Sequence, residues 1–290
     1  MSGLLARAYY QVDVFGCRPG KGNAVAVIDG DGLSDEAMAT IARWSHLPET
    51  AFLLAPSASA LSRGADYRAR IFTPRTELPF AGHPTLGCAA AWEAHHGGQS
   101  GGPAKLLQEC ALGLIAIQRE HREHFAFRAP QLQRSGRVDP ATLGDVATTL
   151  RVSDDEILDC AWADNGPGWI GVQLRDAAAV LAVSPDFRLM AAYGLSIGVC
   201  GLCPDSHGPD VRLEVRAFTP ADGPDEDPVT GSLHAALAQW LQPKNVLPTS
   251  FTARQGRAIG FDGYASIRTD AIGTWVSGQT RILVRGTICI

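Results

Sequence analysis

The sequence predicts an α+β protein made of two similar domains, each a curved, mostly antiparallel sheet wrapped around a central helix. Three observations lead to this prediction. A β-rich segment with a helix start occurs twice, a strand–helix–strand order precedes each copy, and the helix that follows each copy is apolar on most sides. With 290 residues, against about 100–200 for a typical domain, the chain has room for two such units. We expect a pseudo-twofold axis to relate them.

The repeat is clearest between residues 67–87 and 213–231. Each copy is a β-rich run ending in Phe-Thr-Pro, followed by a loop and then by X-Pro-x-x-Gly, which opens an apolar helix. X is His83 in the first copy and Asp227 in the second. Two different polar residues at matching helix starts of a duplicated scaffold suggest one site built from both halves.

The elements before and after each copy follow the same order. Residues 23–56 are typical of strand, helix and strand, with Ser34 as the N-cap and acidic residues in the first helical turn. Residues 170–204 repeat this order, with the helix expected within 184–194. Short strands follow each long helix, and the glycines and turn clusters between them indicate a mostly antiparallel sheet. They span residues 106–120, 124–130, 250–269 and 274–290.

The two central helices and one polar stretch set the predicted domains. Residues 84–96 and 228–241 are apolar nearly all round, which is typical of a helix inside a core. The polar stretch 131–140 marks the division, whereas the Gly-rich segment 97–103 is a loop within the first half. We therefore predict a first domain over residues 1–130, joined by the last strand at 279–290, and a second over 131–278.

Composition narrows the function classes. A net charge of −5 without a basic cluster argues against a nucleic-acid partner. The sequence lacks a run of 18 or more apolar residues, so we expect no membrane span, and its N-terminus lacks the core of a signal peptide. Seven irregularly spaced cysteines do not suggest a disulfide framework, and we expect a cytoplasmic protein. Cys200 and Cys203, with His207 nearby, read as buried thiols; a metal or redox role is the minor alternative.

Two candidate site residues lie at the starts of the two central helices. Pro84 and Pro228 suit the first helical position, which leaves His83 and Asp227 as the predicted N-caps. The N–H groups that follow form an anion site aided by the helix dipole. If the halves face each other across the pseudo-twofold axis, both starts point into one cleft that can hold a carboxylate. Close approach of a backbone or ligand is expected at Gly82, Gly87 and Gly231.

The third candidate is Glu49, which stands just before a strongly apolar strand. A partly desolvated carboxylate there can accept a proton and return it near neutral pH. The corresponding place in the second half offers Ser196 or Ile197, and no acid. Taken singly, Glu49 also fits an exposed strand edge and Asp227 a structural cap, while His83 fits either role; their pairing within the repeat favours a functional site.

These residues strongly resemble the PhzF-like family, named for phenazine biosynthesis, within the diaminopimelate epimerase fold. The motifs occur in the family's order across almost the whole chain and are together highly specific. They are DVF at 13–15, GN at 22–23, LPETAF at 47–52, RIFTPRTELPFAGHPTLG at 70–87, RAFTP at 216–220 and EDPVTGS at 226–232.

The resemblance implies a site between two similar domains, usually a homodimer, and no cofactor or metal. In the phenazine enzyme, the glutamate matching Glu49 moves a proton between carbons of a dihydro-hydroxyanthranilate. By the same match His83 and Asp227 would position the substrate and assist proton transfer. The epimerase relatives place a cysteine at each helix start, so two-thiol racemisation is not expected here. Gly231 and Ser232 would help to hold the substrate carboxylate through the helix start, and Gly82 is the third residue expected to bind the substrate.

Several positions depart from the family pattern. Pro48 replaces the usual Ser before the glutamate, which removes a hydroxyl and an N–H. The other departures, at Lys21, Ala24, Leu233 and His234, also leave the acid/base set intact, and the resemblance does not identify the substrate.

The expected function is therefore a cofactor-independent isomerase that uses Glu49 on a small carboxylate. An epimerase or dehydratase of a hydroxy or amino acid, using the same glutamate, is one alternative. A non-catalytic protein of the same fold that binds small acids is the other.

Overall fold

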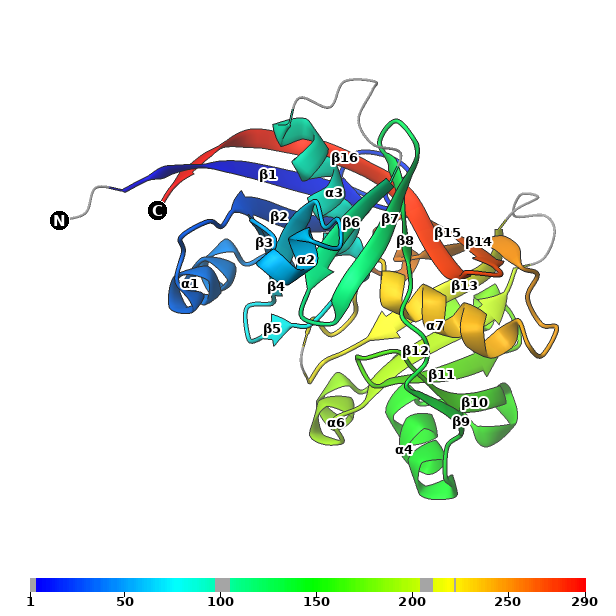
Figure 1. Ribbon diagram of the computed structural model, residues 1–290. Coiled ribbons are helices and arrows are strands. Elements are labelled where there is room, and N and C mark those ends of the chain that lie inside the picture. The colour runs from blue at the N-terminus through cyan, green and yellow to red at the C-terminus, as the bar shows by residue number, and fades with distance from the viewer. Residues whose placement is uncertain (1–3, 97–104, 204–210, 222) are drawn as a thin grey trace. The chain divides into compact units, whose positions relative to one another are not determined.

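A computed structural model describes residues 4–96, 105–203, 211–221 and 223–290 (Figure 1). By its internal contacts the chain divides into two compact units, Met1–Arg128 with Ser277–Ile290 and Ala129–Val276. The chain passes from one unit to the other after Arg128 and again within its last strand. That each unit is an independent domain, with the boundaries given above, remains a prediction.

The first unit contains three helices and a series of strands among its described residues. The helices are α1 (Asp35–Ser45), α2 (Ala58–Leu61) and α3 (Gly82–His95). The strands are β1 (Ala6–Val14), β2 (Asn23–Asp29), β3 (Glu49–Leu54), β4 (Tyr67–Phe72), β5 (Glu77–Leu78), β6 (Lys105–Cys110), β7 (Gly113–His121) and β8 (His124–Arg128), joined by the C-terminal part of β16 (Gly273–Cys289).

The sheet of the first unit closes around α3. Its strand order is β1-β2-β3-β4-β6-β7-β8-β16, and β16 pairs back onto β1 (Figure 1). The pairs β2–β3 and β4–β6 are parallel, whereas β1–β2, β3–β4, β6–β7 and β7–β8 are antiparallel. Helix α3 contacts β1, β2, β3, β4 and β8. A Cβ on Gly87 would lie 2.5 Å from Val25 Cγ1, so glycine allows the helix to approach β2.

Helix α1 covers the outer face of this sheet. As predicted, Ser34 is its N-cap, and Ser34 Oγ accepts a hydrogen bond from the Ala37 N–H at 3.2 Å. On the buried face of the helix, Met38 and Ile41 pack with Phe52 of the sheet. The sheet is therefore buried by α3 on one face and, in part, by α1 on the other.

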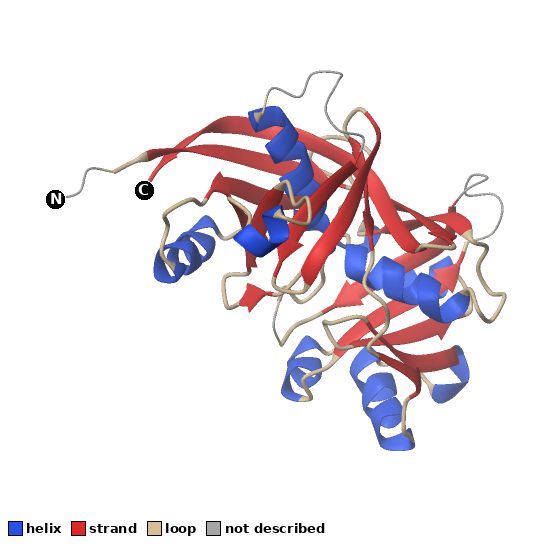
Figure 2. Cartoon of the chain, in the orientation of Figure 1, coloured by secondary structure: helices blue, strands red, loops and turns tan. Residues whose placement is uncertain are grey.

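The second unit repeats this plan. Its helices are α4 (Pro140–Leu150), α5 (Ala177–Ala182), α6 (Phe187–Ala192) and α7 (Gly231–Leu241), with 3₁₀ turns at Asp154–Glu156 and Arg257–Ile259 (Figure 2). Its strands are β9 (Arg134–Arg137), β10 (Ile157–Asp164), β11 (Trp169–Leu174), β12 (Ser196–Leu202), β13 (Val211–Phe218), β14 (Ser250–Gln255), β15 (Gly263–Asp270) and the start of β16.

From β10 onward, strand order and direction in the second unit match those of the first unit from β1 onward, and β9 pairs with β10 as the C-terminal part of β16 pairs with β1. The order is β9-β10-β11-β12-β13-β14-β15-β16, and β11–β12 and β13–β14 are its parallel pairs, as β2–β3 and β4–β6 are in the first unit. Helix α7 contacts β10, β11 and β15, as the buried central helix of this sheet. The predicted architecture of a curved, mostly antiparallel sheet around a helix is thus present in each unit.

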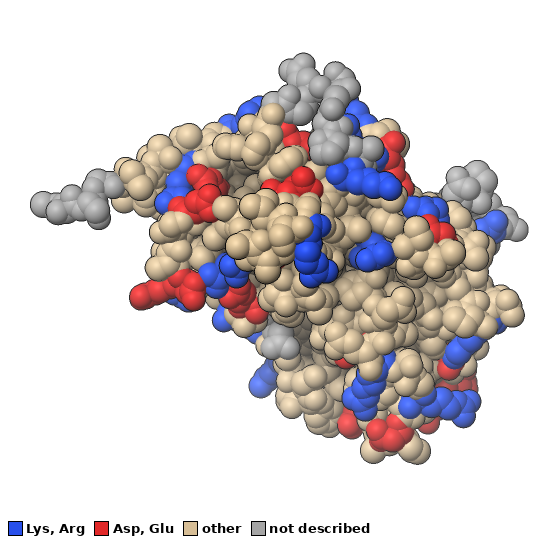
Figure 3. All heavy atoms as spheres, viewed as in Figure 1, with Lys and Arg blue, Asp and Glu red and all other residues tan. Residues whose placement is uncertain are grey.

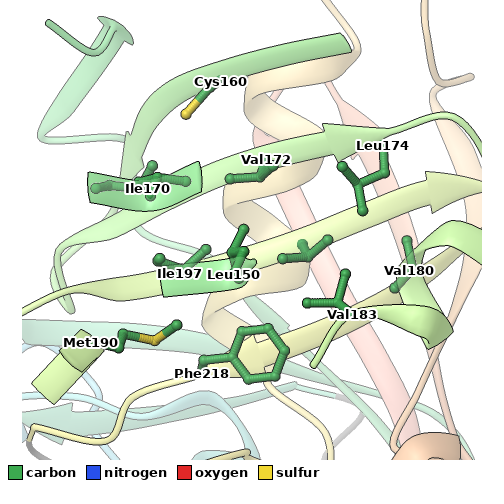
Figure 4. Packing of buried hydrophobic residues seen from close by; sticks show 12 residues of the cluster. Leu150, Cys160, Ile170, Val172, Leu174, Val180, Val183, Met190, Ile197 and Phe218 are labelled. Carbon is green, nitrogen blue, oxygen red and sulfur yellow. The ribbon is translucent and has the colours of Figure 1, made fainter. Parts of the chain in front are cut away.

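Strand β11 shows how the sheet of the second unit is buried on both faces. Ile170, Val172 and Leu174 alternate along it and belong to a cluster that includes residues of α4, α5 and α6 (Figure 4). A Cβ on the intervening Gly171 would lie 2.7 Å from the Trp240 ring of α7. This period of two places α7 and the smaller helices on opposite faces of the sheet.

Some elements were not predicted. No structure was predicted for residues 141–164, which contain β10 and all of α4 except Pro140, or for α5. The polar stretch 131–140 contains β9, whose residues are all exposed and which pairs with β10 at the end of the strand order. A polar edge strand has no apolar alternation to reveal it. The Gly-rich segment 97–103 and His207 lie outside the described residues.

The remaining structural predictions concern thiols and membrane spans. Cys200 and Cys203 are buried and form no disulfide, and burial raises the pKa of both thiols. Within the described part of the chain, no three His, Cys, Asp or Glu side chains gather as a metal site. Nor does any described helix have the length and apolar character needed to span a membrane.

Candidate active site

Glu49 is the first residue of β3, directly opposite Val25 in the parallel pair with β2. The next residues of β3, Thr50 to Phe52, are buried, because this strand lies between α1 and α3. The Glu49 side chain is 14% exposed. The carboxylate is therefore largely withdrawn from solvent at the end of a rigid strand, but is still accessible.

His83 lies beside Glu49. Its Nε2 atom is 3.1 Å from Glu49 Oε2, and the imidazole is 5% exposed. The two groups are at ion-pair distance, although they are not aligned as a conventional hydrogen bond. A carboxylate and an imidazole this close can share or exchange a proton, and the sign of their interaction depends on whether the imidazole is protonated.

The predicted N-cap roles of His83 and Asp227 are wrong. Helix α3 begins at Gly82 with Ala81 as its N-cap, so His83 lies within the first helical turn. Pro84 follows it in that turn, where an intrahelical partner for its missing N–H is not required. The local pattern located the helix start correctly to within two residues, but not the cap.

In the second unit the helix begins later than predicted. Helix α7 starts at Gly231 with Thr230 as its N-cap. Asp227 instead forms an antiparallel bridge with Ala217, and its N–H donates to the Ala217 carbonyl at 2.9 Å. This pairing holds Asp227 in an extended segment, so a tertiary contact overrides the local helix signal.

Asp227 is buried and held by its neighbours. Its Oδ2 atom accepts a hydrogen bond from Thr230 Oγ1 at 2.5 Å. The Gln255 amide donates to the Asp227 carbonyl oxygen at 2.8 Å and to Thr230 Oγ1 at 3.0 Å. No role was predicted for Thr230, although it lies in the motif at 226–232, or for Gln255, whose contacts join segments far apart in the sequence.

Gly231 and Ser232 form the start of α7, three residues later than the predicted start at Pro228. Ser232 Oγ accepts a hydrogen bond from Trp169 Nε1 at 3.1 Å, and its carbonyl oxygen accepts one from Asn165 Nδ2 at 2.9 Å. Because its Oγ acts as an acceptor here, the hydroxyl proton can be donated to a ligand. The backbone N–H groups of the first helical turn lack intrahelical partners, which suits an anion.

A buried ion pair holds the segment just before Asp227. Arg216 Nε and Nη2 donate to the two carboxylate oxygens of Glu226 at 2.9 and 2.7 Å, and Arg216 Nη1 donates to the Val183 carbonyl oxygen. Glu226 and Asp227, the last two residues of the acidic run before Pro228, are both buried. In the sequence, the arginine that both R-x-F-T-P motifs share was the feature from which this ion pair could have been predicted.

His234, one of the departures from the family pattern, is buried in α7. Burial lowers the pKa of its imidazole to about 3, an effect that the neighbouring Gln255 amide partly offsets. The ring is therefore neutral near physiological pH.

Strand register identifies the counterpart of Glu49 in the second unit. Thr50 lies opposite Phe72, and Ile197 lies opposite Phe218, the matching phenylalanine of the repeat. The residue before Ile197 is Ser196, so the matching position carries a hydroxyl and no acid. The duplicated scaffold thus has its strand-borne carboxylate in the first unit alone.

The structure brings the predicted residues together in two sets. Glu49, Gly82 and His83 belong to the first unit, and Asp227, Gly231 and Ser232 to the second, each set gathered around the start of its central helix. Their roles toward a substrate remain predictions. On the face shown in Figure 3, acidic and basic side chains are interspersed.

Comparisons with known proteins agree with these features. The family model described as phenazine biosynthesis-like protein matches residues 12–290. Trans-2,3-dihydro-3-hydroxyanthranilate isomerase of Pseudomonas aeruginosa is 32% identical over 93% of this chain and 92% of its own. Antisense-enhancing sequence 1 of Schizosaccharomyces pombe is 30% identical over 98% of this chain and 99% of its own. A crystal structure of a phenazine biosynthesis protein of the PhzF family from Enterococcus faecalis has a TM-score of 0.79 at 25% identity, covering 99% of this chain and 100% of that one. This likeness confirms the predicted fold class.

Proposed function

Since this chain belongs to the phenazine biosynthesis-like family, we propose that it is a cofactor-independent isomerase that moves a proton between two carbons of a small carboxylate. The observation that carries the proposal is the pair of Glu49 and His83, with Oε2 and Nε2 3.1 Å apart and only the carboxylate appreciably accessible. A single carboxylate at the end of a rigid strand can remove a proton from one carbon and return it to another.

In this proposal each group has a separate task. Glu49 takes the proton from carbon, and His83 steadies the charge that moves between the carboxylate and the substrate. Asp227 positions the substrate from the second unit. The N–H groups at Gly231 and Ser232 bind the substrate carboxylate, with the Ser232 hydroxyl as a further donor.

We further propose that the substrate binds between the two units, with Gly82 beside it. Because the Glu49 side chain remains 14% exposed, the proton that it holds can exchange with solvent before a proton is returned to carbon.

The test uses trans-2,3-dihydro-3-hydroxyanthranilate, the compound in the name of the Pseudomonas relative, as the probe in heavy water. The wild type should give an isomer with deuterium at carbon, whereas Glu49→Gln, folded as the wild type by circular dichroism, should give none. Equal deuterium incorporation by both proteins would reject Glu49 as the acid/base.

The same measurement separates the alternatives. A dehydratase product lacks the mass of one water, and an epimerase product differs only in configuration. If the probe is not turned over, a thermal-shift screen of small carboxylic acids follows, with turnover measured for each acid that binds. Binding that Glu49→Gln leaves unchanged, without turnover of any bound acid, would instead favour a non-catalytic binding protein.

A further inference from the structure

Gln255 is fully buried at the end of β14, where that strand pairs in parallel with β13. Its side-chain amide makes three hydrogen bonds to the segment that carries Asp227. Nε2 donates to the Asp227 carbonyl oxygen at 2.8 Å and to Thr230 Oγ1 at 3.0 Å, and Oε1 accepts from the Thr230 N–H at 3.0 Å. One amide thus holds both ends of residues 227–230.

These bonds also fix the direction of the Thr230 hydroxyl. An amide nitrogen has two protons, and the two acceptors of Gln255 Nε2 use both. Because Thr230 Oγ1 accepts one of them, its own proton is free to point at Asp227 Oδ2, 2.5 Å away. A hydroxyl donated to a carboxylate favours the ionised form of the acid.

We propose that Gln255 is a positioning residue for Asp227: by donating to Thr230 it turns the threonine hydroxyl toward the Asp227 carboxylate, which keeps that group ionised and fixed in direction. The inference rests on the proposed function in assigning Asp227 to the substrate site. Gln255 acts through Thr230 and through the Asp227 backbone, and in this account it does not itself touch the substrate.

The first unit supplies a matched control. Gln108, also fully buried, donates from Nε2 to Thr85 Oγ1 at 3.0 Å, at the start of α3. A Gln108→Glu substitution therefore introduces the same buried change of charge at the other central helix. It leaves the bonds around Asp227 in place.

The decisive experiment is a carbon-13 NMR titration of the Asp227 carboxyl group in the full chain, with the signal assigned by its loss in Asp227→Asn. In Gln255→Glu the new carboxylate cannot donate and instead accepts the Thr230 hydroxyl proton. We expect the Asp227 midpoint to rise by about one pH unit or more, and to be unchanged in Gln108→Glu. An unshifted midpoint in Gln255→Glu would overturn the inference.

A second pair of variants decides the point if Gln255→Glu does not fold. Thr230→Val removes the hydroxyl but keeps the N–H that Gln255 accepts, so the Asp227 midpoint should rise as well. Thr230→Ser keeps the hydroxyl and should restore the wild-type midpoint. Equal midpoints in the valine and serine variants would contradict the role of the hydroxyl.

Turnover adds a separate readout. On the dihydro-hydroxyanthranilate probe, kcat/KM should fall roughly tenfold or more in Gln255→Glu and Thr230→Val, and stay near wild type in Thr230→Ser. The titration requires no turnover. A wild type without activity would therefore count against the proposed function, while the carboxyl midpoints alone decide the role of Gln255.

Discussion

The two copies of the repeat place their acids differently around equivalent helix starts. In the first unit Glu49 lies on the strand beside the helix, 3.1 Å from His83, and its side chain remains 14% exposed. In the second unit the matching strand position is Ser196, and the acid is Asp227, buried in the loop and fixed by Thr230 and Gln255. The two similar scaffolds thus differ: one presents a partly accessible carboxylate, and the other a buried carboxylate held by its neighbours.

The same contrast appears in the arginines of the two R-x-F-T-P motifs. Arg70 binds both carboxylate oxygens of Glu77, and Arg216 binds both of Glu226. The exposed fractions of the side chains are 15% and 37% in the first pair, but 6% and 4% in the second. We therefore expect loss of the ion pair to lower the free energy of unfolding more in the second copy than in the first.

The largest expected difference between the two copies is in the stability lost when each arginine is removed. Arg216→Met leaves Glu226 buried without its charge partner, so the free energy of unfolding should fall by about 3–5 kcal/mol. Arg70→Met breaks two solvent-screened pairs, with Glu77 and Asp35, and should cost about 1 kcal/mol or less. Urea unfolding of both variants at pH 7.5 measures the difference, and losses of equal size would show that burial does not distinguish the two arginines.

A smaller effect concerns His234, whose counterpart in the first copy of the repeat is Ala90. Its folded-state pKa of about 3 lies below the ordinary 6.5, so between these values the unfolded chain binds a proton that the folded chain does not. Stability is therefore lost as the pH falls through this window. Between pH 7.5 and pH 5 the wild type should lose about 2 kcal/mol more than His234→Gln.

Urea unfolding of the two proteins at both pH values checks this. Other groups that titrate are shared by wild type and variant, so their contributions cancel in the comparison. Parallel losses of stability in the two proteins would mean that His234 is not held neutral by burial.

The repeat made the fold predictable, because apolar patterns and turn residues repeat wherever the two units share elements. Helices α4 and α5 and strand β10 were missed, since they lie outside the strongest part of the repeat. The start of α7 was misplaced because the Asp227–Ala217 bridge, a contact between separate segments, holds Asp227 in an extended conformation. Glu49, His83 and Asp227 could be found from motifs, whereas Gln255 depends on a contact with residues 227–230 that no local pattern encodes.

Assignment of Ser196 rather than Ile197 as the counterpart of Glu49 likewise required strand register. Both residues are compatible with the sequence repeat, and the pairing of Ile197 with Phe218 decides between them. A shift of one residue along a strand reverses the face on which a side chain lies, so register is the information that an approximate repeat lacks.

The central claim, that the first copy alone carries the proton, is tested most directly at these two matched positions. The rate of deuterium incorporation at carbon in heavy water should fall by on the order of 10³ in Glu49→Gln and change less than about threefold in Ser196→Ala. Comparable losses in the two variants, or none in Glu49→Gln, would contradict the account.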